Sequence, residues 1–157
     1  MPHIIIFAYG NIMRGDDAAG VVLGEYLQKC YLDHPEVEVV VQRQLLPEHL
    51  PMMAQAEELL FLDATIDGEP GEIHHETVVP SKEPMSPMSH SLTPPQMLGM
   101  VKKIYGTPPH ATLWTLTGWE FEHHEGMTEK MTREVEKWRI DVVDYIEEVL
   151  HATVRHV

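Results

Sequence analysis

The chain has 157 residues, 43% of them hydrophobic, which suits one ordinary globular domain and is too short for two comfortable ones. Its 25 acidic and 11 basic residues give a formal net charge of -14, which would repel phosphate backbones and anionic lipid surfaces. The longest apolar runs fall far below the roughly 18 residues of a membrane span. We therefore expect a single domain over residues 1–157, a monomer by default, that binds neither nucleic acid nor membrane.

The amino terminus has no basic region followed by a small-residue cleavage site, so it is typical of the first strand of a mature cytoplasmic protein. Cys30 is the only cysteine, which excludes an internal disulfide and favours a reducing compartment. Because Cys30 lies among apolar residues of a predicted helix, we interpret it as a small buried side chain rather than a nucleophile. From the amino terminus and the single cysteine we expect a cytoplasmic location.

The first half of the chain alternates apolar runs with helical patterns. The apolar runs predict strands over His3–Tyr9, Val37–Gln42 and Leu59–Ala64. Helical spacing predicts one helix from about Ala18 onward and a short helix over Pro47–Glu58, opened by its proline. This order of strand, helix and strand indicates parallel pairing.

The second half begins with a glycine and proline turn and a strand over Glu72–Val79, whose polarity favours a place near a sheet edge. Pro80–Pro95 contains five prolines and predicts a long loop, after which a helix runs to about Tyr105. A fifth strand is expected over Ala111–Thr117. Thr128 can then cap a long final helix with a regular apolar stripe.

Five strands alternating with four helical segments predict an α/β fold, a doubly wound three-layer αβα sandwich. Ligands of such folds bind outside the carboxyl ends of the strands. Three segments of the sequence meet this condition, namely GNIMRGDDAAG after the first strand, LDAT at the end of the third strand and MSHSLTPP in the long loop. Candidate chemistry is therefore sought in these segments.

Each segment offers a side chain that can bind a metal ion. Asp17, Asp63 and His90 form a set of two carboxylates and one imidazole, which suits a divalent ion such as nickel, zinc or manganese. Three protein ligands leave coordination positions open for substrate or water. The sequence therefore predicts a metal site at one edge of the sheet.

Each of these residues also has a purely structural explanation. Asp16 or Asp17 can cap the helix that follows. Asp63 ends a buried strand and can be a satisfied buried hydrogen-bonding group. His90, between two serines, can be an ordinary loop histidine.

Several common catalytic motifs are absent. The sequence contains no GxGxxG, GxxxxGK[ST], GxSxG or HExxH, which argues against a nucleotide-dependent enzyme, a serine hydrolase of the elbow type and a common zinc protease. His74 and His75 are adjacent on a predicted strand and so point to opposite faces. Glu120–Gly126 is explained as a polar loop before a capped helix.

Taken in order, these segments resemble the hydrogenase maturation endopeptidases. The resemblance includes GN-x-M-x-G-D-D-x-x-G at Gly10–Gly20, LDA at Leu62–Ala64 and SHSL at Ser89–Leu92. It extends to QL-x-PE-x-L, a D-G-x-PG turn and TGWEFEHHEGMT before the last helix, and so covers nearly the whole chain.

This resemblance implies a twisted, mostly parallel five-stranded sheet in an αβα fold of the phosphorylase/hydrolase type. It implies metal ligands at Asp17, Asp63 and His90, which recognise nickel already placed in the immature large subunit of a nickel-iron hydrogenase. The enzyme then removes a short C-terminal peptide from that partner. The metal in this case is supplied by the substrate.

A divalent ion at this site could polarise the scissile carbonyl or activate water, as in an aspartyl-type or metal-dependent endopeptidase. Asp16 is a candidate for orienting water or a ligand, so the predicted catalytic set is Asp16, Asp17, Asp63 and His90. One alternative is a non-catalytic nickel-sensing chaperone or docking protein for hydrogenase assembly. Another, by fold analogy alone, is a small-molecule hydrolase.

Overall fold

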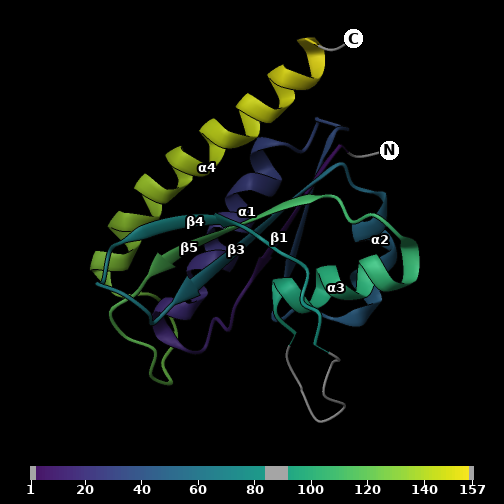
Figure 1. Ribbon diagram of the computed structural model, residues 1–157. Helices are drawn as coiled ribbons and strands as arrows, with labels where there is room; N and C mark the ends of the chain where they lie inside the picture. Colours follow the sequence, from purple (N-terminus) through teal and green to yellow (C-terminus); the bar gives the residue numbers. More distant parts are fainter. Residues whose placement is uncertain (1–2, 84–91, 156–157) are drawn as a thin grey trace.

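The computed structural model describes residues 3–83 and 92–155, which contain one five-stranded sheet (Figure 1). The strands are β1 (Ile4–Tyr9), β2 (Val37–Gln42), β3 (Glu58–Thr65), β4 (Ile73–Thr77) and β5 (His110–Thr117). They lie in the order β2-β1-β3-β5-β4. All neighbouring pairs are parallel except β4 with β5, which is antiparallel, so the predicted mostly parallel sheet is confirmed.

Helices cover both faces of this sheet. They are α1 (Ala19–Cys30), α2 (Leu50–Gln55), α3 (Pro94–Tyr105) and α4 (Glu129–Arg155), with short 3-10 turns η1 (Gly15–Ala18) and η2 (Pro47–His49). Figure 1 shows α1 and α4 on one side of the sheet and α2 and α3 on the other. This arrangement confirms the predicted three-layer sandwich. Within the described residues, no helix has the length and apolar character that a membrane span requires.

The central strands bury both of their faces, which is why their sequences are continuously apolar rather than alternating. Ile4, Ile6 and Ala8 of β1 belong to the core under α1 and α4. Ile5 and Phe7 belong to the core under α2 and α3. Successive residues of a strand thus supply two separate cores.

The last helix follows the predicted stripe closely. The Thr128 hydroxyl accepts a hydrogen bond from the Met131 amide at 3.2 Å, as expected of a cap. Apolar residues spaced three or four apart along α4 then pack against the sheet, with Met131, Val135, Trp138, Val142, Ile146 and Leu150 all buried.

The prediction of a buried Cys30 is wrong, because Cys30 lies outside the face of α1 that packs on the sheet through glycine and leucine. A Cβ on Gly24 would lie 2.4 Å from the Ala8 Cβ, and one on Gly20 would lie 2.5 Å from the Tyr9 carbonyl oxygen. The glycine face is therefore the one in close contact with β1. Cys30 lies elsewhere on the helix and is exposed.

The predicted helix over Pro47–Glu58 is too long. The helix ends at Gln55, Ala56 is extended, and Glu58 is already the first residue of β3. Its buried carboxylate accepts hydrogen bonds from the Tyr145 hydroxyl and from His110 Nδ1, the latter at 2.7 Å. A charged residue can begin a buried strand here because distant segments supply its partners.

The layer of α2 and α3 covers only the first halves of the strands on its face. On this face Leu59, Phe61 and Ala111 are buried, whereas Asp63 and Thr115, which lie further along the same strands, are partly exposed. The opposite face stays buried to the strand ends. The carboxyl ends of the central strands are therefore open to solvent on one side only.

Candidate functional site

Asp17 reaches the carboxyl end of β1 because the strand is followed by glycine. A Cβ on Gly10 would lie 2.2 Å from the Asp17 carbonyl oxygen, so no other residue type allows η1 to pass this close to the strand end. The Asn11 amide donates to Asp17 Oδ2 at 2.8 Å. The Asn11 side-chain oxygen accepts from the Met13 amide at 2.9 Å, which closes the turn that follows β1.

Asp63 lies on the partly open face near the end of β3. Burial is the main cause that raises the pKa of its carboxyl group from 3.8 to about 7, and the nearby negative charge of Asp17 adds to it. Hydrogen bonds from the Tyr9 hydroxyl and the Ala64 amide oppose this rise. Asp63 is thus poorly solvated and lies close enough to Asp17 for the two carboxylates to repel each other.

Tyr9 is a site residue that the sequence analysis missed. Burial, followed by the charge of Asp63 and the hydrogen bond to it, raises the pKa of the Tyr9 hydroxyl well above its usual value. The hydroxyl therefore stays protonated and acts as a donor to Asp63. Its place at the carboxyl end of the first strand was the signal that could have identified it.

Asp17 and Asp63 line one cavity of about 440 Å³ at the carboxyl ends of the strands. Arg14 and Arg43 line it as well, so two basic residues accompany the acidic pair. Leu92–Pro94, at the beginning of α3, forms another part of its wall. Parts of all three segments that were expected at the carboxyl ends of the strands thus meet in this cavity.

The structure brings together two of the three predicted metal ligands. His90 lies outside the described residues, two positions before Leu92 in the sequence. Within residues 3–83 and 92–155, no group of three or more His, Cys, Asp or Glu side chains is arranged to hold a metal ion. The complete ligand set of Asp17, Asp63 and His90 stays a prediction.

Asp16 has a different environment from its neighbour and does not line this cavity. Its carboxylate is fully buried and accepts hydrogen bonds from the amides of Trp119, Glu120 and Thr128 at 2.7, 3.0 and 2.8 Å. The Thr128 hydroxyl donates to it as well, at 3.0 Å. These contacts support a structural role, in which Asp16 ties the loop before α4 to η1.

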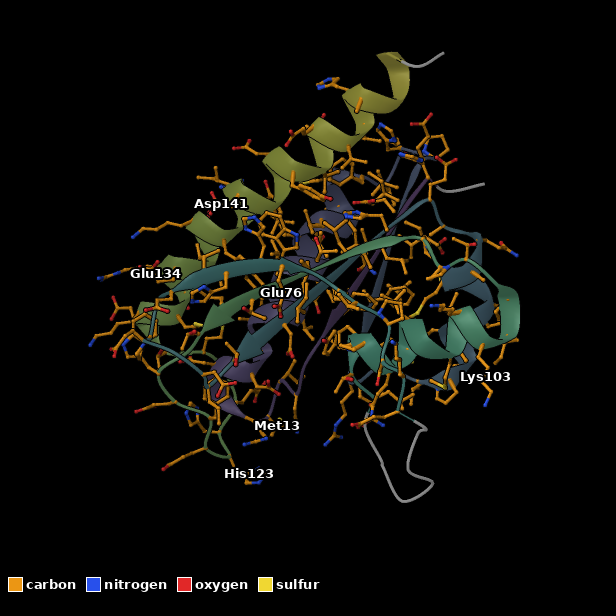
Figure 2. All side chains as sticks on the ribbon, in the orientation of Figure 1. Met13, Glu76, Lys103, His123, Glu134 and Asp141 are labelled. Carbon is orange, nitrogen blue, oxygen red and sulfur yellow. The ribbon has the colours of Figure 1, made fainter. Side chains whose placement is uncertain are left out.

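The loop after β1 and the loop after β5 contact each other at one end of the molecule. In Figure 2, Met13 and His123 lie at the same end of the protein, in the loops that follow β1 and β5. The Gly15 amide donates to the His124 carbonyl oxygen at 3.0 Å, which joins the two loops directly. The residues of Glu120–Gly126 therefore act as a loop that supports η1, in agreement with their interpretation as a polar loop.

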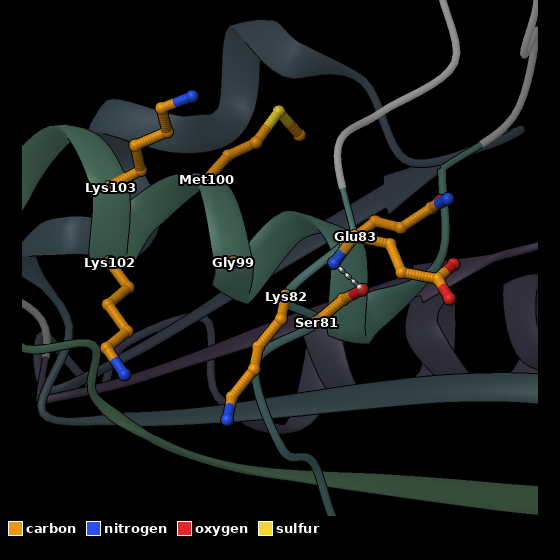
Figure 3. A pocket seen from close by; sticks show the side chains of 8 residues that line it. Ser81, Lys82, Glu83, Gly99, Met100, Lys102 and Lys103 are labelled. Atoms are coloured by element: carbon orange, nitrogen blue, oxygen red, sulfur yellow. Dashed lines mark hydrogen bonds between the residues drawn. The ribbon is translucent and has the colours of Figure 1, made fainter.

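A larger cavity, of about 750 Å³, lies between α3 and Ser81–Glu83 (Figure 3). Lys82, Lys102 and Lys103 line it, but Lys103 points away from the other two, so the three ammonium groups do not converge. Lys102 and Lys103 lie in the last turn of α3, where positive charge interacts favourably with the helix dipole. These lysines have a structural explanation and do not form a site.

Comparison with solved structures identifies the class of protein to which this fold corresponds. The chain is similar to the hydrogenase maturating endopeptidase HybD from Escherichia coli, with 25% identity and a TM-score of 0.76 over 95% of this chain and 94% of that one. It is also similar to a solution structure of an endopeptidase from Escherichia coli, with 24% identity and a TM-score of 0.73 over 95% and 94% of the two chains.

A third similar structure is the [NiFe] hydrogenase maturation protease HycI from Thermococcus kodakarensis, with 23% identity and a TM-score of 0.70 over 92% of each chain. No model of a protein family matches the sequence, and no curated protein matches it either. The chain is thus a structural relative of the hydrogenase maturation endopeptidases over nearly its whole length. The predicted resemblance, fold class and peptidase class are confirmed.

Proposed function

We propose that this protein is an endopeptidase that recognises nickel in the immature large subunit of a nickel-iron hydrogenase and removes the C-terminal peptide of that subunit. Its structural relatives, which are named maturation endopeptidases and proteases, support a role in hydrogenase maturation. The observation that carries the finer proposal is that the carboxylates of Asp17 and Asp63 line one cavity, where burial and the charge of Asp17 raise the pKa of Asp63. We expect this reaction in the cytoplasm.

The carboxylate pair is suited to a cation that arrives with another molecule. Two negative groups that raise each other's free energy are stabilised when a divalent ion lies between them. Two protein carboxylates, with His90 as the proposed third ligand, leave coordination positions for ligands from the partner protein. The nickel ion is therefore part of the substrate in this proposal.

The other residues of the cavity have supporting roles. The Tyr9 hydroxyl and the Asn11 amide donate to Asp63 and Asp17 respectively, so each carboxylate has one oxygen oriented by a neighbour. Arg14 and Arg43 can donate hydrogen bonds to carboxylate or carbonyl oxygens of a bound peptide. The nickel ion would polarise a nearby carbonyl or lower the pKa of a water molecule.

The proposal is tested by incubating the protein with a nickel-loaded large-subunit precursor and measuring the intact mass of the precursor over time. We expect loss of the C-terminal peptide with the wild-type protein. Asp17→Asn and Asp63→Asn should lower the rate by roughly 100-fold or more, since each removes a charged ligand. Asp33→Asn, the same chemical change at an exposed position before β2, is the matched control and should process normally.

Two results would contradict the proposal. Normal processing by folded Asp17→Asn or Asp63→Asn proteins would show that the ligands are assigned wrongly. A stable complex whose precursor keeps its full mass would instead identify the protein as a non-catalytic nickel-sensing chaperone or docking protein. Thermal unfolding of each variant establishes that it is folded.

A further inference from the structure

A second cleft adjoins the carboxylate pair, on the part of the sheet that α2 and α3 leave open. It has a volume of about 510 Å³ and is lined by residues of β3, β4, β5 and the turn after β3. Asp63 lines this cleft as well as the cavity that contains Asp17. The two hollows therefore meet at a residue of the proposed active site.

The register of the strands explains which side chains face this cleft. Asp63 pairs with Thr115, which pairs with His74, and Leu113 on the same face pairs with Glu76. Cross-strand partners point to the same face of a sheet. We call these five residues and Asp67 of the adjoining turn the acidic sheet face.

The unbalanced charges of the acidic sheet face are all negative. It carries the carboxylates of Asp63, Asp67 and Glu76, and no lysine or arginine is found among the described residues that line the cleft. The imidazole of His74 lies 2.7 Å from the Glu72 carboxylate, so any positive charge on it is balanced. This face contrasts with the neighbouring cavity, where Arg14 and Arg43 accompany the acidic pair.

The carboxylates of Asp67 and Glu76 have no partner within the described part of the chain. The turn that contains Asp67 is held by other atoms, because the Thr117 hydroxyl donates to the Asp67 carbonyl oxygen at 2.7 Å and the Asp67 amide donates to Thr65 Oγ1 at 3.1 Å. Glu76 is exposed, and in the view of Figure 2 it lies between the helix that carries Glu134 and Asp141 and the helix that carries Lys103. Neither charge is needed to maintain the fold.

From the charge of this face and its continuity with Asp63, we propose that the acidic sheet face binds a lysine- or arginine-rich segment of the same partner protein whose cleavage is proposed above. A cationic side chain fits the face better than a bound metal ion, since the described residues contain no cluster of three metal-binding groups. The open cleft accommodates an extended chain over Leu113 and Thr115. Docking there places the adjoining part of the partner over the carboxylate pair.

The inference rests on the proposed function for its partner, so the test measures binding and cleavage separately. The probe is the nickel-loaded large-subunit precursor, and the variant is Asp67→Asn with Glu76→Gln. We expect the Kd and the KM to rise about 5-fold at low ionic strength, with a smaller change in kcat. The difference from the wild-type protein should shrink as salt is added, because screening weakens the attraction.

The matched control is Asp33→Asn with Glu36→Gln, which removes the same two charges near the amino end of β2, on the far edge of the sheet. It should bind and cleave like the wild-type protein. If the control and the variant show equal Kd, KM and salt dependence, the acidic sheet face is not a docking surface and the proposal is overturned. If the wild-type protein binds without cutting, only the proposed endopeptidase activity fails, and the Kd comparison still tests the face.

Discussion

Asp16 and Asp17 are neighbours in the chain, yet their carboxylates lie in opposite environments. Asp16 is fully buried and accepts hydrogen bonds from four groups, the amides of Trp119, Glu120 and Thr128 and the Thr128 hydroxyl. Asp17 accepts one from Asn11 and faces a cavity that it shares with Asp63. The first carboxylate is satisfied by the fold itself, and the second is left with capacity for a ligand.

This comparison teaches how a site can be recognised when no ligand is present. A buried charge whose acceptor positions are occupied stabilises the fold, whereas a pair of like charges with few partners destabilises it. A protein retains the second arrangement when it serves binding or catalysis. The predictions below test the two carboxylate environments, beginning with the largest expected effect.

Removal of the Asp16 carboxylate should have the largest effect on stability. Asp16→Ala leaves three backbone amides and the Thr128 hydroxyl without their acceptor and detaches the loop before α4 from η1. We expect the free energy of unfolding to fall by about 4 kcal/mol, measured by urea denaturation. Thr128→Ser keeps the donor hydroxyl and is the control, with little expected change. A loss as small as that of the control would show that Asp16 is not a structural residue.

Neutralising Asp63 should stabilise the folded protein, whereas removing the Asp16 carboxylate destabilises it. The folded-state pKa of Asp63 is raised from 3.8 to about 7, so the folded protein binds a proton there that the unfolded chain has released. This contribution to stability is complete below the unfolded pKa and is lost as pH rises through the folded pKa. The shift corresponds to roughly 4 kcal/mol at most, and partial exposure reduces it.

We therefore expect metal-free Asp63→Asn to be more stable than the wild-type protein by about 2 kcal/mol near pH 8 and by much less near pH 5. Urea denaturation in the presence of a chelator, repeated across this pH range, measures the difference. Asp33→Asn serves again as the control. A difference that does not vary with pH would mean that Asp63 is not under electrostatic strain.

The smallest effects concern the pKa of Asp63 alone. Asp17→Asn removes a negative neighbour and should lower this pKa, whereas Tyr9→Phe removes a hydrogen-bond donor and should raise it. NMR titration of the Asp63 carboxyl carbon in the metal-free protein measures both shifts. Shifts in the same direction for the two variants would contradict the geometry described for the pair.

Much of the fold could be predicted from local patterns. Runs rich in apolar residues identified β1, β2 and β3, and helical spacing with Thr128 as the cap identified α4, because both signals depend on residues close together in the chain. The prediction for Pro47–Glu58 was wrong at its end, since the partners of Glu58 are His110 and Tyr145, more than fifty positions away. The predicted burial of Cys30 was wrong because the buried face of α1 is formed by Gly20, Leu23, Gly24 and Leu27, and Cys30 lies outside that face.

The candidate site was predicted in part for the same physical reason. The rule that ligands bind at the carboxyl ends of parallel strands is enough to select the pair Asp16 and Asp17, together with Asp63, from sequence. It could not separate Asp16 from Asp17, because both follow the same strand and only their distant partners differ. Tyr9 was missed because its role depends on contact with β3 rather than on its own neighbours in the chain.

The amino-acid sequence by itself determined the strand and helix segments, the acidic character of the chain and the segments from which a site can be built. These properties depend on side-chain type and short-range spacing. Only the tertiary structure decided which carboxylate is occupied by backbone donors, which one faces a cavity, and that Asp63 joins this cavity to the acidic sheet face. Such properties depend on burial and on contacts between segments far apart in the chain, which local sequence patterns do not encode.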